Sequence, residues 1–260
     1  MAPTPRDLPG SRVLLDDLGV EVAVPAVAER VVSLVPSLTE ALASVRRTAL
    51  VGVTDWCTHP GDLDALRVRG TKNPDLAAIE SLTPDLVIAN QEENREIDVR
   101  RLRERGVPVW VTRIETVPEA IESMRRLFDE ALSWPAPDWL GSARDLWCGE
   151  PAPARARTAT CIWRDPWMVV GRDNFTSDLL GRAGLPNVFA DHAERYPAAP
   201  VAEIEDAGAD LVLLPDEPYA FHPGDGPEAF TRTPTRLVEG RLLTWYGPSL
   251  LEAWAELSRW

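Results

Sequence analysis

The sequence has little of the chemistry that most catalytic and metal sites require. It holds three cysteines without a C-x-x-C pair, three histidines without H-x-x-x-H spacing, and a single lysine, Lys72. It contains no P-loop, G-x-S-x-G or G-x-G-x-x-G pattern. These absences argue against a zinc finger and a disulfide framework, and we find no nucleophile beside a base.

Positive charge is also scarce. Lys and Arg number 27 against 41 Asp and Glu, a net charge of −14, which argues against nucleic acid or an anionic membrane as the partner. No apolar run approaches the ~20 residues of a membrane-spanning helix. The start, MAPTPRDLPGSR, shows no basic region followed by an apolar core. It predicts no secretory signal, so we expect a cytoplasmic protein, or an extracytoplasmic one if the chain was trimmed.

The stretch from Arg30 to Glu40, RVVSLVPSLTE, gives the clearest structural signal. Val31 to Val35 is a nearly all-apolar, β-branched run, typical of a strand buried on both faces, and Pro36 ends it. Ser37 and Glu40 have capping-box spacing, which predicts a helix N-terminus. A buried strand leading into a helix N-terminus is where open α/β sheets bind ligands.

Strands and helices alternate along the first half. A hairpin is predicted over 11–26, strands over 49–53, 85–89 and 107–111, and helices over 75–82 and 94–105. This β-α-β-α order predicts a parallel sheet with helices on its faces.

The second half repeats this organisation after a helical connector. Helical spacing runs from 117 to 148 with breaks at Pro135 and Pro137. The segment SLTPDLVIAN at 81–90 has a near-copy, DAGADLVLLP, at 206–215. We therefore predict an α/β fold with two Rossmann-like lobes and a ligand cleft between them. The predicted domains are an N-terminal lobe at 1–114, a long, broken backbone helix at 115–150, and a C-terminal lobe at 151–260.

Loops at the carboxyl ends of the strands should line that cleft, and they are rich in aromatic residues. The predicted ligand-binding residues are Trp56, His59, Asn90, Gln91, Trp163, Trp167, Tyr196, Trp245 and Tyr246. Such rings suit a large, flat, partly apolar ligand. The alternative is that they pack the lobes. Core spacing favours that structural role for Trp110, Trp139, Trp147 and Trp254.

Several segments resemble one family in order and spacing. They are RVVSLVPSLTEAL, LVGVTDWCTHP, RGTKNPDLAAIESLTPDLVIAN, RGVPVWVT and WRDPWMVVGRDNFTSDLLGRAGLPNVF. Together they resemble the helical-backbone metal-chelate receptors, the class III substrate-binding proteins for vitamin B12, haem and ferric siderophores. Within that family the vitamin B12-binding proteins are the most similar, and the resemblance extends over about 11–250.

The resemblance implies two lobes joined by a rigid helix, with a corrinoid held edge-on between them by aromatic contacts. It implies a first-lobe contact at Trp56 or His59, and second-lobe contacts at Trp167 and Tyr196. Trp245 and Tyr246 lie where the family often closes the cleft. Asn90 stands where the vitamin B12 binders have an aromatic residue, so one wall differs.

Exported members of the family carry a glutamate on a surface helix of each lobe, which docks to arginines of a membrane permease. The matching positions here are Ala77 and Ala202, although Glu80 and Glu203 lie nearby. This departure argues against permease docking. We therefore hypothesise a cytosolic, monomeric, non-catalytic protein that binds cobalamin or a related corrinoid. It would have no catalytic cofactor and no metal ligand of its own, with His59 as a possible cobalt ligand.

Three alternatives stay open. The same fold could bind a ferric siderophore or haem, and anionic chelates require arginines such as Arg164, Arg172 and Arg232. A small-metabolite enzyme could use the cleft, although no nucleophile–base pair supports it. An interaction protein would have the cleft filled by side chains.

Overall fold

A computed structural model describes residues 10–260, which form two compact units. The first takes in the chain up to Ile114 with residues 119–141 and 246–248, and the second takes in 115–118, 142–245 and 249–260. Each is α/β with a largely parallel sheet, which confirms the predicted fold class. The predicted domain boundaries and the cleft stay predictions. Residues 1–9, part of the start that predicted no secretory signal, lie outside the described residues.

The first unit is built on a five-stranded parallel sheet in the order β5-β4-β3-β8-β9. The strands are β3 (Val31–Ser33), β4 (Leu50–Val53), β5 (Leu66–Arg67), β8 (Leu86–Asn90) and β9 (Val109–Thr112). All residues of β3, the central strand, are buried, as the apolar run predicted. The short pair β6 (Arg69–Gly70) and β7 (Asn73–Pro74) was not predicted, because two-residue strands show no periodicity.

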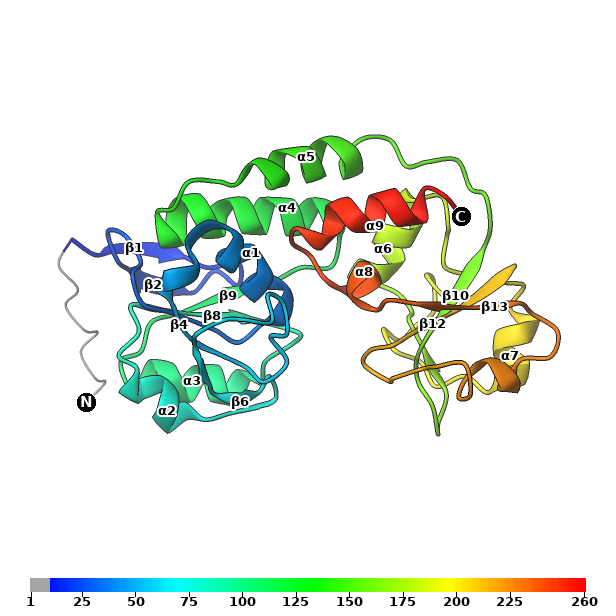
Figure 1. Ribbon diagram of the computed structural model, residues 1–260, viewed down its shortest axis with the longest axis horizontal. Coiled ribbons are helices and arrows are strands. Elements are labelled where there is room, and N and C mark those ends of the chain that lie inside the picture. The colour runs from blue at the N-terminus through cyan, green and yellow to red at the C-terminus, as the bar shows by residue number, and fades with distance from the viewer. Residues whose placement is uncertain (1–9) are drawn as a thin grey trace. The chain divides into compact units, whose positions relative to one another are not determined.

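Helices cover both faces of this sheet. α2 (Leu76–Ser81) and α3 (Glu96–Glu104) lie on one face, and α1 (Pro36–Arg46) and α4 (Val117–Arg126) lie on the other (Figure 1). Ile79 of α2 and Leu102 of α3 are fully buried in one core with Val32 and Val87 of the sheet. Burying each such side chain contributes about 1.5–3 kcal/mol, so packing rather than local sequence holds these short helices in place.

Helix α1 begins one residue earlier than its predicted cap. Val35 is the N-cap residue and Pro36 occupies the first turn, where its missing N–H needs no partner. Ser37 therefore lies inside the helix, and the capping-box prediction is wrong. The buried hydroxyl of Thr39 instead donates to the carbonyl of Val35 at 2.9 Å.

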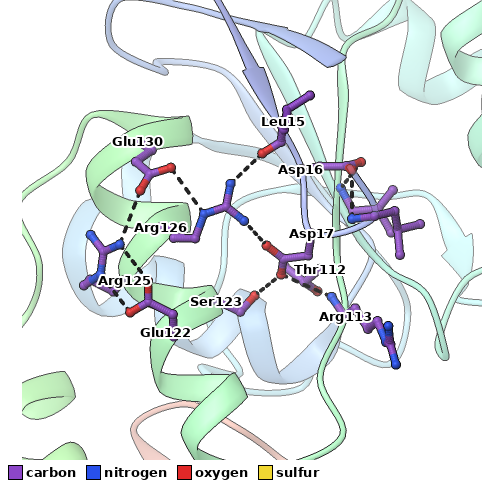
Figure 2. Close-up of polar contacts among 12 residues, drawn as sticks. Leu15, Asp16, Asp17, Thr112, Arg113, Glu122, Ser123, Arg125, Arg126 and Glu130 are labelled. Carbon is purple, nitrogen blue, oxygen red and sulfur yellow. Dashed lines mark hydrogen bonds and ion pairs between the residues drawn. The ribbon is translucent and has the colours of Figure 1, made fainter. Parts of the chain in front are cut away.

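The predicted N-terminal hairpin is present as β1 (Arg12–Leu15) and β2 (Glu21–Val24), and its turn is bound to helix α4. The Asp17 carboxylate accepts hydrogen bonds from Ser123 Oγ and Arg126 Nη1, each at 2.5 Å (Figure 2). Arg126 also donates to the carbonyl of Leu15 at 2.5 Å. Asp17 thus fixes the hairpin to the start of the connector.

The connector is helical and broken, as predicted. Helix α4 continues as a π-helical stretch, Leu127–Leu132, which ends at Ser133 in the left-handed conformation with φ of 54°. Helix α5 (Asp138–Trp147) follows after the two prolines. Between them Trp134 is buried, and its Nε1 donates to the carbonyl of Ala28 at 2.9 Å.

Four tryptophans have the structural role that their spacing predicted. Trp110 is completely buried in β9. Trp147 packs edge-to-face on Trp254 with ring centroids 4.9 Å apart. Trp139 packs in the same way on Phe128 at 6.4 Å. Edge-to-face pairs of this kind add about 0.5–1.5 kcal/mol beyond the area they bury.

The second unit contains a four-stranded sheet in the order β11-β10-β12-β13. The elements are β10 (Thr158–Trp163), β11 (Met168–Val169), α6 (Phe175–Arg182), α7 (Val201–Asp206), β12 (Leu211–Pro215), β13 (Thr235–Val238), α8 (Arg241–Thr244) and α9 (Ser249–Leu257). Only the pairing of β10 with β11 is antiparallel in this sheet of the described chain. Helix α7 lies on one face of the sheet, and α6 and α8 lie on the other (Figure 1).

The predicted internal repeat makes the same contacts in both units. Asp85 precedes β8, and its Oδ2 accepts the N–H groups of Glu29 at 2.9 Å and Arg30 at 2.8 Å. Asp210 precedes β12, and its Oδ2 accepts the N–H of Arg157 at 2.8 Å. In each unit the arginine comes directly before the neighbouring parallel strand. The near-copy therefore marks two equivalent strand pairs, β3 with β8 and β10 with β12.

Candidate functional site

The first unit exposes a tryptophan at the carboxyl end of β4. Trp56 lies in the loop that follows this strand and is 65% exposed. His59 is exposed in the same loop, with its Nδ1 3.1 Å from Thr58 Oγ1. Single exposed apolar side chains are common on protein surfaces, so it is the position of Trp56 after a parallel strand, not its exposure alone, that makes it a candidate.

The loop that carries Trp56 is fixed from beneath. The neighbouring thiol of Cys57 is buried, with its Sγ 3.0 Å from Thr39 Oγ1 and 3.1 Å from Thr54 Oγ1, and this burial raises the pKa of Cys57. Arg67 Nη1 donates to the carbonyls of Thr54 at 2.9 Å and Cys57 at 2.8 Å. The backbone is therefore held on both sides of Trp56, which presents its ring from an ordered loop.

Asn90, at the end of β8, is used within its own turn. It is 2% exposed, and its Oδ1 accepts the N–H groups of Glu92 at 2.8 Å and Glu93 at 3.2 Å. Its Nδ2 donates to Thr112 Oγ1 at 3.1 Å. The adjacent Gln91 is exposed. Ligand contact by these two residues stays a prediction, and the amide of Asn90 already has partners on both of its polar atoms.

The second unit carries a cluster of five aromatic residues, here called the aromatic wall: Trp163, Trp167, Tyr219, Phe221 and Phe230. Trp163 is 44% exposed and meets Tyr219 edge-to-face at 5.6 Å. Trp167 stacks on Phe221 at 5.6 Å and meets Phe230 edge-on at 5.2 Å. The structure therefore brings together two predicted residues, Trp163 and Trp167, at the turn between β10 and β11.

Three members of the aromatic wall were missed from the sequence. Tyr219 and Phe221 lie in the loop after β12, in the segment PDEPYAF. Asn90 corresponds to Pro215 in the repeat, so the equivalence of β8 and β12 does not identify Tyr219, which lies further along the loop. Phe230 lies much further along the loop, and no local pattern identifies it.

The other predicted residues of the second half have polar partners or are buried. Tyr196 is half-buried, and its hydroxyl accepts a hydrogen bond from Asn174 Nδ2 at 2.7 Å. Trp245 is 7% exposed, and its Nε1 donates to Glu217 Oε1 at 2.7 Å. Tyr246 is buried as well and belongs to the first unit, whereas Trp245 belongs to the second. A ligand role for these three residues stays a prediction.

The arginines considered for anionic chelates are all paired with carboxylates. The partners are Asp225 and Glu228 for Arg164, Asp173 for Arg172, and Glu205 and Asp206 for Arg232. Their N–O distances include 2.5 Å from Arg164 to Glu228 and 2.6 Å from Arg172 to Asp173. A guanidinium with such partners has less capacity to bind a ligand carboxylate.

The described residues contain no group of three His, Cys, Asp or Glu side chains that could hold a metal ion. Coordination of a ligand's cobalt by His59 alone stays a prediction. Within residues 10–260 no helix combines the length and the apolar character needed to cross a bilayer.

The two positions compared with permease-docking glutamates lie on equivalent helices. Ala77 is exposed on α2, and Ala202 is exposed on α7, the helix that precedes β12. The nearby Glu80 is paired with Arg105 at 3.3 Å, and Glu203 is exposed beside Ala202. The absence of permease docking stays a prediction.

Curated relatives share sequence over most of the chain. The vitamin B12-binding protein of Vibrio cholerae is 25% identical over 190 residues, which cover 70% of this chain and 69% of that protein. The vitamin B12-binding protein of Salmonella typhi is 28% identical over 181 residues, covering 65% of this chain and 66% of the relative. No family model matches the chain.

Solved structures share the fold. The periplasmic vitamin B12-binding protein of Vibrio cholerae superimposes with a TM-score of 0.72 at 20% identity, covering 89% of this chain and 96% of that structure. A periplasmic haem-binding protein of Pseudomonas aeruginosa gives 0.70 at 23% identity, with 89% and 92% covered. The relatives found by sequence and by structure are named as binding proteins and not as enzymes, in agreement with the prediction of a non-catalytic protein.

The cytoplasmic location expected from the sequence is wrong by this comparison, because the solved relatives are periplasmic. The expectation rested on the polar start of the chain and on Ala77 and Ala202 at the positions compared with docking glutamates. The fold and the sequence relatives agree with each other. The resemblance to the two-lobed metal-chelate receptors, with vitamin B12-binding proteins among the relatives, is thereby confirmed.

Proposed function

We propose that the protein binds a corrinoid of the cobalamin type without converting it, and that Trp56 and Trp163 are ligand contacts. One observation carries the proposal: each unit presents an exposed indole at the carboxyl end of a parallel strand. The relatives named vitamin B12-binding protein support the choice of ligand.

The exposed rings leave enough area for useful affinity. A tryptophan side chain buries about 150–250 Å² when covered. With 65% of Trp56 and 44% of Trp163 exposed, full covering would contribute at most about 2–4 and about 1.5–3 kcal/mol at ~25 cal/mol per Å². Part of this gain is lost to the ordering of ligand and protein on binding.

Haem is the second candidate, because haem-binding proteins share the fold. Haem carries two carboxylates, and ferric siderophores are commonly anionic, whereas a cobalamin presents mainly amides around its ring. The arginines weighed for anionic ligands are paired with carboxylates of the chain. This pairing favours the corrinoid.

The test is a titration of the purified protein with cyanocobalamin, and separately with haemin, followed by calorimetry and by tryptophan fluorescence. We expect binding of cyanocobalamin and a Kd raised about tenfold or more in Trp56→Ala and Trp163→Ala. Trp260→Phe is the control, because its indole already packs under the Arg236 guanidinium at 4.4 Å. No heat and no quenching up to high micromolar cyanocobalamin would refute the proposal.

A further inference from the structure

A charge cluster beside Trp163 has no part in the proposed ligand contacts. Arg164 Nη1 bonds to the carboxylates of Asp225 and Glu228, the latter at 2.5 Å. The Tyr219 hydroxyl donates to Asp225 Oδ2 at 2.6 Å. The Arg164 guanidinium also lies over the ring of Trp167, 5.4 Å from its centroid. One cation therefore contacts two carboxylates and the aromatic wall.

The two carboxylates are fixed within their own loop. Asp225 and His222 exchange backbone hydrogen bonds at 2.9 and 3.1 Å, and the N–H of Gly226 donates to Glu228 Oε2 at 2.6 Å. The hydroxyl of Tyr219, together with the nearby Arg164 charge, lowers the pKa of Asp225, so this carboxylate is ionised at neutral pH. Arg164 thus joins two ordered segments, the β10–β11 turn and the loop after β12.

These two segments carry the exposed Trp163 and the half-buried Tyr219. Trp163 is the last residue of β10 and Tyr219 lies in the loop after β12, and their contact is edge-to-face. Without a tie between the segments, both rings would have to be ordered when a ligand binds, at a cost in affinity. With the adjacent Asp165, whose Oδ2 lies 3.9 Å from Arg164 Nε, the cluster holds one positive and three negative charges, so it repels rather than attracts an anion.

We propose that Arg164 is a positioning residue that holds Trp163 and Tyr219 as one preordered contact surface for an uncharged ring ligand, and that it does not bind a ligand anion. The identity of the ligand rests on the proposed function. The positioning of the two rings does not, because it can be measured without ligand.

The direction in which three substitutions change the Kd of the ligand distinguishes positioning from anion binding. If Arg164 positions the rings, Arg164→Gln, Asp225→Asn and Glu228→Gln each raise the Kd for cyanocobalamin about three- to tenfold, the range of an aromatic contact. If Arg164 instead binds an anion, Asp225→Asn and Glu228→Gln release the guanidinium from its carboxylate partners, and these two variants bind haemin more tightly. In that case only Arg164→Gln weakens haemin binding. That second pattern would overturn the proposal.

The measurement without ligand uses near-ultraviolet circular dichroism. The difference between the native spectrum and that of Trp163→Phe reports the Trp163–Tyr219 pair. We expect Arg164→Gln and Asp225→Asn to abolish most of this difference signal, while the far-ultraviolet spectrum is unchanged. Arg172→Gln is the control, because Arg172 pairs with the adjacent Asp173 and the substitution therefore removes a local ion pair of the same unit. An unchanged difference spectrum in both variants refutes positioning. Loss of the signal in a protein that binds no corrinoid upholds positioning and refutes the proposed function alone.

Discussion

Asp17 offers the sharpest test of how the hairpin is bound to the connector. Its carboxylate, with a side chain 10% exposed, accepts hydrogen bonds from Ser123 Oγ and Arg126 Nη1 at 2.5 Å and from the N–H of Arg113 at 3.2 Å (Figure 2). Asp17→Ala removes all three bonds and leaves the side chain of Ser123, a residue only 4% exposed, without this acceptor.

The expected loss follows from these contacts. A hydrogen bond to a charged group contributes about 1.5–3 kcal/mol, and a buried hydroxyl without its partner costs about 1–3 kcal/mol. Arg126 keeps the carbonyl of Leu15 at 2.5 Å and Glu130 at 3.3 Å, which reduces the penalty. We therefore expect Asp17→Ala to lower the free energy of unfolding by about 2–4 kcal/mol.

Hydrogen–deuterium exchange is the suitable assay, because two units need not unfold together. Protection of the amides of β9 and α4 should fall at least about tenfold, since 1.4 kcal/mol is tenfold in an equilibrium constant. Asp129→Ala is the matched control, because Asp129 is 43% exposed and pairs with Arg125 at 3.3 Å on the same helical segment. Loss of this exposed ion pair should lower the free energy of unfolding by about 0.5 kcal/mol. Equal protection in the two variants would show that the Asp17 contacts do not hold the hairpin.

Three further predictions concern stability and thiol chemistry. Backbone N–H groups and an arginine lower the pKa of Glu205 to about 2 from 4.5, so the stabilisation from its carboxylate is complete above pH 4.5 and is lost toward pH 2. Glu205→Gln should therefore reduce the fall of the free energy of unfolding between pH 4.5 and pH 2. An unchanged fall over this range would contradict the prediction. Asp85→Ala and Asp210→Ala remove equivalent backbone contacts, so each should reduce amide protection mainly in its own unit, and a reversed pattern would refute the equivalence. Under native conditions an aromatic disulfide reagent should titrate Cys148 quickly and the two buried thiols only on unfolding; three fast thiols would contradict the burial.

Much of the fold could be predicted because its signals are periodic. The apolar run of β3 is buried throughout, and the breaks at Pro135 and Pro137 separate the helical segments of the connector. The start of α1 was misread, because two patterns compete there. Ser37 has the spacing of a cap, but Pro36 fits the first turn, so the helix starts closer to the N-terminus than the cap spacing predicts.

The site was harder to predict, because the position of a residue at a strand end does not give the direction of its side chain. Asn90 lies where expected, yet its amide turns back to the N–H groups of its own turn. Trp56 lies in a similar loop, and its ring points to solvent because the buried Cys57 takes the inward position. Tyr219 was missed because the repeat ends at Pro215 and gives no information about the loop that follows β12.

The internal repeat indicates which parts of the chain carry specificity. Asp85 and Asp210 fix equivalent strand pairs, so the sheets of the two units share a common architecture. The exposed aromatic residues do not follow this repeat: β3 is followed by helix α1, whereas the equivalent β10 ends at the exposed Trp163 and is followed by the turn before β11. The contacts of Asp85 and Asp210 are thus common to both units, whereas the exposed aromatic residues distinguish one unit from the other.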